Sequence, residues 1–476
     1  MTYLVNGLYI LAFGMFILGL SGLTGPKTAV RGNWIADAGM GIAVIATLIS
    51  VRDTAAINWI LIAAGLAIGV ALGVPPAKKT KMTAMPQLVA LFNGVGGGTV
   101  ALIAWAEFIE TDGFAHITET PSIALVVGSL FAAIIGSVSF WGSLVAFLKL
   151  QESLPKNLEK TLVKSAKLFQ ASNVVLLITA IGVSVYIGLH AGTGTPLWLI
   201  VVVLVLAGFM GLFVVFPIGG ADMPVVISLL NAMTGLSAAA AGLALNNTAM
   251  IVAGMIVGAS GSILTNLMAV AMNRSIPAIV FGSFGAGSAG AAAVGDTDQG
   301  TVKATSAADA AIQMAYANQV IVVPGYGLAV AQAQHTVKEM ADLLEAKGVE
   351  VKYAIHPVAG RMPGHMNVLL AEADVDYDAM KEMDDINGEF GRTDVTIVIG
   401  ANDVTNPAAR NDPSSPIHGM PILDVDKSRS VIVLKRSMSS GYAGIENPLF
   451  FLGQTSMLFG DAKKSVSGVI EELKAL

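Results

Sequence analysis

The chain of 476 residues contains no cysteine and few charged residues. Without cysteine it can form neither disulfides nor thiolate metal sites, and it cannot use a cysteine nucleophile. Charged residues make up 13% of the chain, whereas soluble domains carry about 25%. Much of the polypeptide is therefore expected to face lipid. The net charge of −6 gives no reason to expect nucleic acid as a partner.

Long apolar runs fill the N-terminal part of the chain, and the mean hydropathy of the whole is +0.71. A membrane helix needs about 20 apolar residues. Nine segments meet this requirement: 3–23, 34–51, 57–74, 85–105, 122–148, 168–190, 197–216, 223–245 and 250–272. The first run lacks a preceding basic segment and a small-residue cleavage site, which favours a membrane span over a signal peptide.

Basic residues in the connecting loops predict the orientation of these spans. If the C-terminal part lies in the cytoplasm, an odd number of spans places the N-terminus outside. The loops on the cytoplasmic side then carry almost all of the loop lysines and arginines, whereas the outer loops carry Arg52 alone. This distribution follows the positive-inside rule.

The sequence pattern changes after Arg274. Residues 276–305 are rich in glycine, alanine and serine, which indicates a linker. Residues 306–476 have the size of one soluble domain. Strands are expected at 319–323, 349–355, 395–399, 430–434 and 457–459, and helices at 306–318, 327–347 and 461–476. The alternation predicts a multi-pass α-helical membrane domain (residues 1–275) followed by an α/β Rossmann-like parallel-sheet domain.

A glycine pair lies between the first expected strand and the helix that follows it. In a dinucleotide fingerprint at this position, Gly325 permits a tight turn and Gly327 lets the backbone approach a pyrophosphate. The helix N-terminus then offers free N–H groups to the anion. Val330 occupies the third glycine position of the fingerprint, so a purely structural turn stays an alternative.

Two features favour a nucleotide with a 2′-phosphate. The second expected strand ends at Ile355-His356, without the acidic residue that holds a ribose 2′-hydroxyl in NAD sites. Lys435, Arg436 and Ser437 directly follow an apolar strand, where two cations and a hydroxyl can bind a phosphate. A solvated basic turn is the alternative, and NADP(H) is the preferred interpretation.

Several longer segments then show a family resemblance. Residues 325–334, 356–367, 400–403, 435–438 and 441–450, together with 217–226 in the membrane half, closely resemble the β subunit of proton-translocating NAD(P) transhydrogenase. The resemblance covers nearly the whole chain. It implies that the soluble domain binds NADP(H), that hydride passes to or from NAD(H) on a partner, and that the membrane domain couples this transfer to proton movement.

The resemblance also implies an assembly and a location. The partner is expected to be the α subunit or subunits, which carry the NAD(H) domain and the remaining transmembrane helices. A dimer of this heteromeric unit is expected in a bacterial-type inner membrane, with the nucleotide domain in the cytoplasm. The chain has no second dinucleotide fingerprint, so it is expected to be inactive without this partner.

The resemblance assigns the nucleotide contacts residue by residue. The implied NADP(H)-binding residues are Tyr326, Val358, Ala359, Gly360, Arg361, Met362, Pro363, Gly400, Ala401, Asn402, Asp403, Val404, Gly419, Met420, Lys435, Arg436, Ser437, Met438, Ser439, Ser440, Gly441, Tyr442, Asp461 and Ala462. Among them, residues 435–437 match those that hold the 2′-phosphate, and Asp403 matches an acid near the nicotinamide. No catalytic acid, base or metal is expected, because direct hydride transfer needs positioning and exclusion of water.

Polar residues in the membrane half form a second candidate group. Asn93, Ser143 and Asn231 resemble the family's polar channel positions, although each alone can be an interhelical hydrogen bond. Asp222, just before the 223–245 span, is expected to link the membrane and soluble domains, with a helix N-cap as the alternative. Histidine is the natural proton relay, and because none lies in mid-span, a partner helix is expected to supply one.

Two other functions fit the architecture. A channel or transporter gated by NADP(H) would also combine membrane spans with a nucleotide domain, but the chain has no carbonyl filter sequence of the TVGYG type. An oxidoreductase that reduces a quinone would need haem, flavin or iron ligated by cysteine. The lack of cysteine and of mid-span histidine weighs against it.

Overall fold

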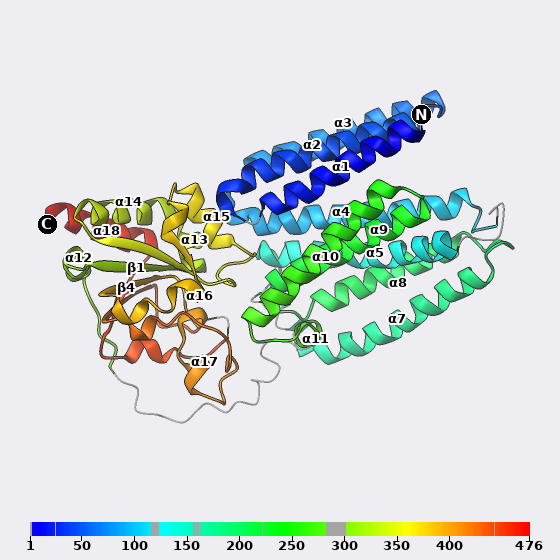
Figure 1. Cartoon of the computed structure of the whole chain (residues 1–476). Helices are drawn as coiled ribbons and strands as arrows, with labels where there is room; N and C mark the ends of the chain where they lie inside the picture. Colours follow the sequence, from blue (N-terminus) through cyan, green and yellow to red (C-terminus); the bar gives the residue numbers. More distant parts are fainter. Residues whose placement is uncertain are drawn as a thin grey trace. The chain divides into compact units, whose positions relative to one another are not determined.

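The computed structural model describes residues 2–23, 25–115, 123–155, 158, 161–162, 164–220, 222–281, 301–441 and 443–476 (Figure 1). The chain divides into two compact units. The first contains residues 1–81, 87–216 and 227–264, and the second contains residues 82–86, 217–226 and 265–476.

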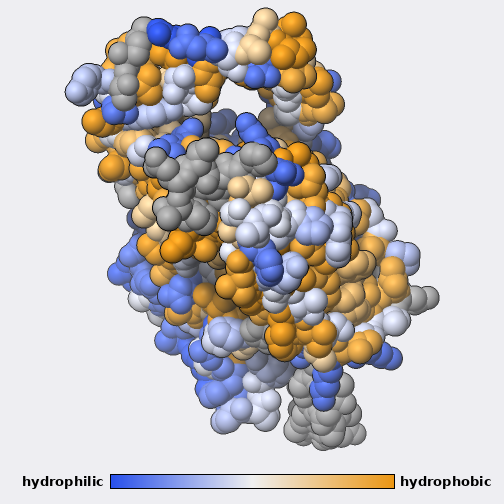
Figure 2. Space-filling model, turned by 90° about the vertical axis from the view of Figure 1, so that its right-hand side faces the viewer, coloured by the Kyte–Doolittle hydropathy of each residue, from blue (hydrophilic) through white to orange (hydrophobic). Residues whose placement is uncertain are grey.

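Within the described residues, nine helices are long and apolar enough to cross a membrane, as the sequence predicts. They are α1 (Thr2–Gly22), α2 (Pro26–Ser50), α3 (Ala56–Lys79), α4 (Met85–Glu110), α5 (Ile123–Leu150), α7 (Ala166–Leu189), α8 (Trp198–Val215), α9 (Met223–Ala244) and α10 (Thr248–Ala271). Orange, apolar side chains cover much of the surface in Figure 2, and Leu66 is 68% exposed. Exposed apolar surface of this extent suits lipid rather than water.

Small residues allow these helices to pack closely. A Cβ atom added to Gly254 of α10 would lie 2.4 Å from the backbone nitrogen of Ala239 in α9, closer than any real contact. The two helix backbones therefore touch directly, as the abundance of glycine and alanine predicts.

The C-terminal part contains a six-stranded sheet in the order β3-β2-β1-β4-β5-β6. Every neighbouring pair is parallel. The strands are β1 (Gln319–Pro324), β2 (Glu350–Ile355), β3 (Met380–Glu382), β4 (Val395–Ile399), β5 (Ser430–Lys435) and β6 (Thr455–Phe459). The strand order reverses between β1 and β4, which is the point where doubly wound sheets bind ligands.

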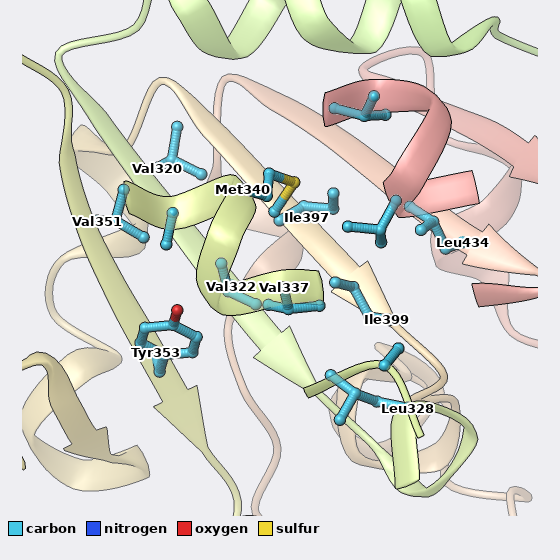
Figure 3. Close-up of a cluster of buried hydrophobic side chains, with 14 of the residues drawn as sticks. Val320, Val322, Leu328, Val337, Met340, Val351, Tyr353, Ile397, Ile399 and Leu434 are labelled. Carbon is cyan, nitrogen blue, oxygen red and sulfur yellow. The ribbon is translucent and has the colours of Figure 1, made fainter. Parts of the chain in front are cut away.

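Alternate side chains of the strands face two separate cores. Val320 and Val322 point into the core that Figure 3 shows, under the helices α12 (Ala307–Ala315), α14 (Gln334–Ala346) and α18 (Ala462–Ala475). Ile321 and Val323 pack on the opposite face, against α16 (Met383–Ile386) and the 3₁₀ turns η4 (Phe390–Arg392) and η7 (Pro448–Phe451). Burial on both faces explains why these strands read as continuous apolar runs.

The prediction of a single helix at 327–347 is wrong. The structure has two helices, α13 (Tyr326–Ala331) and α14, separated at Gln332, which adopts a left-handed conformation with φ 50°. The amide of Ala333 donates to the carbonyl of Leu328, which ends α13 in the manner of a left-handed helix cap. The short strand β3 was also missed, because its three residues carry no apolar run.

Other short segments complete the second unit. They are α11 (Ile276–Phe281), α15 (His365–Glu372), α17 (Ala408–Asn411) and the 3₁₀ turns η1 (Met82–Ala84), η3 (Tyr377–Ala379), η5 (Asp403–Thr405) and η6 (Val425–Lys427). Residues 303–305, in the expected linker, pair with Met457 of β6. Most of the remaining linker, residues 282–300, lies outside the described residues.

Candidate functional site

A cavity of about 590 Å³ opens at the carboxyl ends of β1, β4 and β5. It lies at the reversal of strand order. Most of the contact residues expected from the sequence line it: Tyr326, Val358, Ala359, Gly360, Gly400, Ala401, Asn402, Asp403, Val404, Met420, Lys435, Arg436, Ser437, Ser439, Ser440, Gly441 and Ala462. Segments more than 100 residues apart in sequence are thus brought to one site by the topology of the sheet.

The glycine turn after β1 forms one wall of the cavity. A Cβ on Gly325 would lie 2.4 Å from the amide nitrogen of Ala401, and a Cβ on Gly327 would lie 2.6 Å from the Cα of Gly400. Gly400 itself has φ 71°, a conformation that favours glycine. The glycines are required because the loops after β1 and β4 touch backbone to backbone. Gly325 was expected to permit a tight turn, but its φ of −131° is one that any residue adopts. The close approach of the two loops, and not the turn, therefore requires a glycine here.

Two cations and two hydroxyls gather at the end of β5. The Lys435 ammonium donates to the carbonyl oxygen of Ser439, and the Ser437 and Ser439 hydroxyls are 2.6 Å apart. The Arg436 guanidinium lies 3.4 Å from the carboxylate of Asp461, the residue that caps α18. Burial lowers the pKa of Lys435, and the Asp403 carboxylate acts in the opposite direction. This cluster is the most basic part of the cavity wall.

Asn402 and Asp403 connect the floor of the cavity to the segment that follows the basic cluster. The Asp403 Oδ2 atom accepts from the amide of Ala443 at 3.0 Å. The Asn447 side-chain nitrogen donates to the Asn402 carbonyl at 3.1 Å and to its side-chain oxygen at 3.2 Å. The Asp403 carboxylate therefore holds the backbone at Ala443 directly. The preceding residue, Tyr442, lies outside the described residues.

Two buried histidines support the loop after β2. His356 Nδ1 accepts from the amide of Val358 at 3.2 Å, and Nε2, which then carries the proton, donates to the Pro421 carbonyl at 2.9 Å. His365 Nδ1 accepts from the amide of Arg361 at 3.0 Å. Burial lowers the pKa of each histidine to about 4, so both are neutral at physiological pH. Each ring accepts a backbone amide of this loop and so helps to fix its conformation.

Some expected contact residues do not line the cavity. Arg361 instead stacks its guanidinium 4.4 Å from the ring centroid of Tyr326, which does line the cavity. Met438 lines a smaller neighbouring cavity of about 180 Å³. The others that lie beyond the lining are Met362, Pro363, Gly419 and Asp461. The lining residues that the sequence did not predict as contacts are Met272, Val330, Pro416, Ile417, Leu434, Ala443 and Gly460. Of these, only Val330, at the third fingerprint position, carried a sequence signal.

A polar cluster joins three helices of the membrane part. The Asn93 side-chain nitrogen of α4 donates to Ser143 at 2.9 Å and to Ser139 at 3.3 Å, both on α5. Ser139 also contacts the Thr234 hydroxyl of α9. Asn231 lies on the exposed side of α9 and is not part of this cluster. Ser139 and Thr234 were not expected from the sequence.

Asp222 forms an ion pair with Arg274. The carboxylate is fully buried, and its Oδ2 atom accepts from Arg274 Nη1 at 2.6 Å. Asp222 directly precedes α9 and Arg274 closely follows α10, so the pair connects the ends of these two helices. A buried carboxylate is tolerated here because a guanidinium compensates its charge.

The apolar helices and the cavity together define a membrane protein with a dinucleotide-binding Rossmann-type domain. The family model described as NAD(P) transhydrogenase beta subunit matches residues 5–472. Two relatives from Rhodospirillum rubrum, each described as NAD(P) transhydrogenase subunit beta, are 48% identical over 467 residues, which is 98% of this chain and 98% of the relative. The chain belongs to the NAD(P) transhydrogenase beta subunit family. This family implies a nicotinamide nucleotide and an alpha subunit partner, and it does not favour the channel alternative.

Proposed function

We propose that the chain binds NADP(H) in the cavity at the end of β1, β4 and β5. The observation that carries the proposal is the basic cluster of Lys435 and Arg436 with the Ser437 hydroxyl at the cavity wall. Two cations and a hydroxyl match the charge and the acceptor oxygens of a 2′-phosphate. The strand β2 ends at Ile355, followed by His356, so the acid typical of NAD sites is missing from the described loop.

The chain's residues also fit the other parts of a dinucleotide. Gly325 and Gly327 line the cavity with backbone atoms alone, which a pyrophosphate can approach closely. Tyr326, stacked under Arg361, presents a rigid aromatic surface. Apolar side chains of Ile417 and Met420 border the cavity and help to exclude water. We place the nicotinamide near Asp403, where the family resemblance expects an acid.

Bound NADPH supplies a hydride, and NADP⁺ accepts one. The protein contributes orientation and a water-poor surrounding, without a nucleophile or general base.

A partner alpha subunit brings NAD(H), and the chain is inactive without it. The physiological unit is a dimer of this heteromer in a bacterial-type inner membrane, with the nucleotide domain in the cytoplasm. Residues 1–275 form the membrane domain, 276–305 the linker, and 306–476 the NADP(H) domain.

We further propose that proton movement uses the polar cluster around Asn93 and Ser143. Asn231 extends this path toward a partner helix, because it is exposed on α9. That helix supplies the relay histidine that this chain lacks in mid-span. Asp222, paired with Arg274, transmits the change between the membrane helices and the nucleotide domain. One elementary charge that crosses 100 mV is worth about 2.3 kcal/mol, enough to shift an equilibrium constant more than tenfold.

The test uses vesicles that contain this chain and its alpha subunits. We expect NADPH-dependent reduction of an NAD analogue, with a rate that changes when a proton gradient is imposed. Asn93→Leu should abolish the response to the gradient and leave NADP(H) binding intact. Ser129→Ala is the control, because this buried hydroxyl of α5 has no partner among the described residues. Nucleotide-dependent ion flux without hydride transfer would instead support the channel.

A further inference from the structure

The ammonium group of Lys435 lies over an aromatic ring. Its Nζ atom is 4.7 Å from the ring centroid of Phe450, within the distance of about 6 Å at which a cation is attracted by the ring face. Phe450 is 2% exposed. The ring therefore offers Lys435 a desolvated surface, where such an attraction is stronger than in water.

The Phe450 ring is held firmly in place. It belongs to the 3₁₀ turn η7, which Asn447 caps by accepting from the amide of Leu449 at 3.0 Å. Asn447 also donates to Asn402, which lines the nucleotide cavity. Phe450 itself packs in the core cluster on the second face of the sheet. The turn that carries the ring is thus hydrogen-bonded to the cavity wall through Asn447, and the ring itself packs in the core.

The Lys435 backbone is fixed as well, because it is the last residue of β5 and its carbonyl accepts from the amide of Gly460 at 3.0 Å. The remaining freedom is that of the four-carbon side chain, whose ordering costs up to about 2 kcal/mol. The Ser439 carbonyl already accepts from the ammonium, and a second partner that holds it before the nucleotide arrives reduces this cost further. Burial lowers the pKa of Lys435, in keeping with an ammonium withdrawn from water.

An aromatic ring is suited to this task in a way that a carboxylate is not. A carboxylate would hold the lysine but would also neutralise it and repel a phosphate. The neighbouring Arg436 shows that arrangement, since its guanidinium faces Asp461 at 3.4 Å and both groups are exposed to water. The ring attracts the ammonium and leaves its positive charge available.

We propose that Phe450 is a positioning residue for NADP(H) selection: its ring face holds the Lys435 ammonium at the cavity wall, ready for the 2′-phosphate. The inference rests on the proposed NADP(H) site. It assigns to Phe450 a share in discriminating NADP(H) from NAD(H), although the residue does not line the main cavity.

The test measures the dissociation constants of NADP⁺ and NAD⁺ for the full chain in lipid nanodiscs. In one variant, 3,4,5-trifluorophenylalanine replaces Phe450, which keeps the ring shape and removes the negative potential of its face; Phe450→Leu removes the ring. Phe451→Leu is the matched control, because Phe451 lies on the same turn and packs against the same cluster. Both changes at Phe450 should weaken NADP⁺ binding by about 2- to 30-fold and leave NAD⁺ binding unchanged.

The outcomes are distinguishable. An equal loss of NADP⁺ and NAD⁺ affinity would mean that Phe450 supports only the fold, and unchanged NADP⁺ affinity in the fluorinated variant would overturn the proposal. A loss of the same size and selectivity in Phe451→Leu would also contradict it. If the unaltered chain already binds NAD⁺ as tightly as NADP⁺, the proposed NADP(H) site itself fails, whatever the variants do.

Discussion

At the scale of single residues, His356 shows how a buried ring can hold two binding loops together. One nitrogen accepts from the amide of Val358 and the other donates to the carbonyl of Pro421, so the ring connects the loop after β2 with the loop that contains Met420. Val358 and Met420 both line the nucleotide cavity. Protonation would place a second N–H where Nδ1 now accepts, and would break the connection.

This arrangement predicts a pH dependence of stability. Burial lowers the pKa of His356 to about 4 in the folded chain, whereas the unfolded value is about 6.5. Between these values the unfolded state binds more protons, so stability falls as pH is lowered from about 6.5 to about 4. At pH 5 the loss should be about 2 kcal/mol. Hydrogen exchange in residues 306–476, corrected for intrinsic rates, should show this loss and a shallower pH dependence in His356→Gln. An unchanged slope in that variant would disprove the assignment.

The sequence predicts some residues of the site better than others. Lys435 and Arg436 were predictable because cations directly after an apolar strand lie at the ligand-binding edge of a parallel sheet. Phe450 was not, since a phenylalanine in a short turn gives no sign of which cation lies over its ring. Ser139 and Thr234 were missed for the same reason: hydroxyls in an apolar helix become a cluster only when three helices meet.

At the scale of elements, the close approach of the loops after β1 and β4 organises the site. A methyl group on Gly325 would lie 2.4 Å from the Ala401 amide, so Gly325→Ala must push the two loops apart. Overpacking of this kind costs about 1–3 kcal/mol. We expect the affinities for NADP⁺ and NAD⁺ to fall together, by roughly 5- to 150-fold, in a titration of the full chain.

The control for this change is Gly388→Ala. Nothing lies within 4 Å of a Cβ added to Gly388, and its φ is not in the left-handed region. This variant should bind both nucleotides normally. If Gly325→Ala also binds normally, the close backbone contact is not needed for the site.

The strands and spans were largely predictable, because burial on both faces or in lipid produces long apolar runs. The break at Gln332 was not, since the amphipathic pattern continues from α13 into α14 and nothing in it marks the residue that turns left-handed. The strand β3 was missed because it lies at the edge of the sheet, where polar side chains such as Lys381 and Glu382 are tolerated.

At the scale of the whole molecule, the chain combines apolar helices with a doubly wound nucleotide domain. This combination is that of the NAD(P) transhydrogenase beta subunit family, to which the chain belongs. The low fraction of charged residues, 13%, predicted the membrane part, and the alternation of strands and helices predicted the second part. The expectation that an alpha subunit binds NAD(H) while this chain binds NADP(H) came from resemblance to relatives. No physical pattern within one chain can identify a cofactor bound by another.

We propose above all that the cavity selects a dinucleotide with a 2′-phosphate. The most direct measurement is the ratio of the NAD⁺ and NADP⁺ dissociation constants for the full chain, before and after Arg436→Ala. We expect strong preference for NADP⁺ in the unaltered chain. Hydrogen bonds to charged groups are worth about 1.5–3 kcal/mol, so Arg436→Ala should reduce the ratio by roughly 10- to 150-fold, through weaker NADP⁺ binding alone. A chain that binds both nucleotides equally, or a variant that keeps the full preference, would contradict the account.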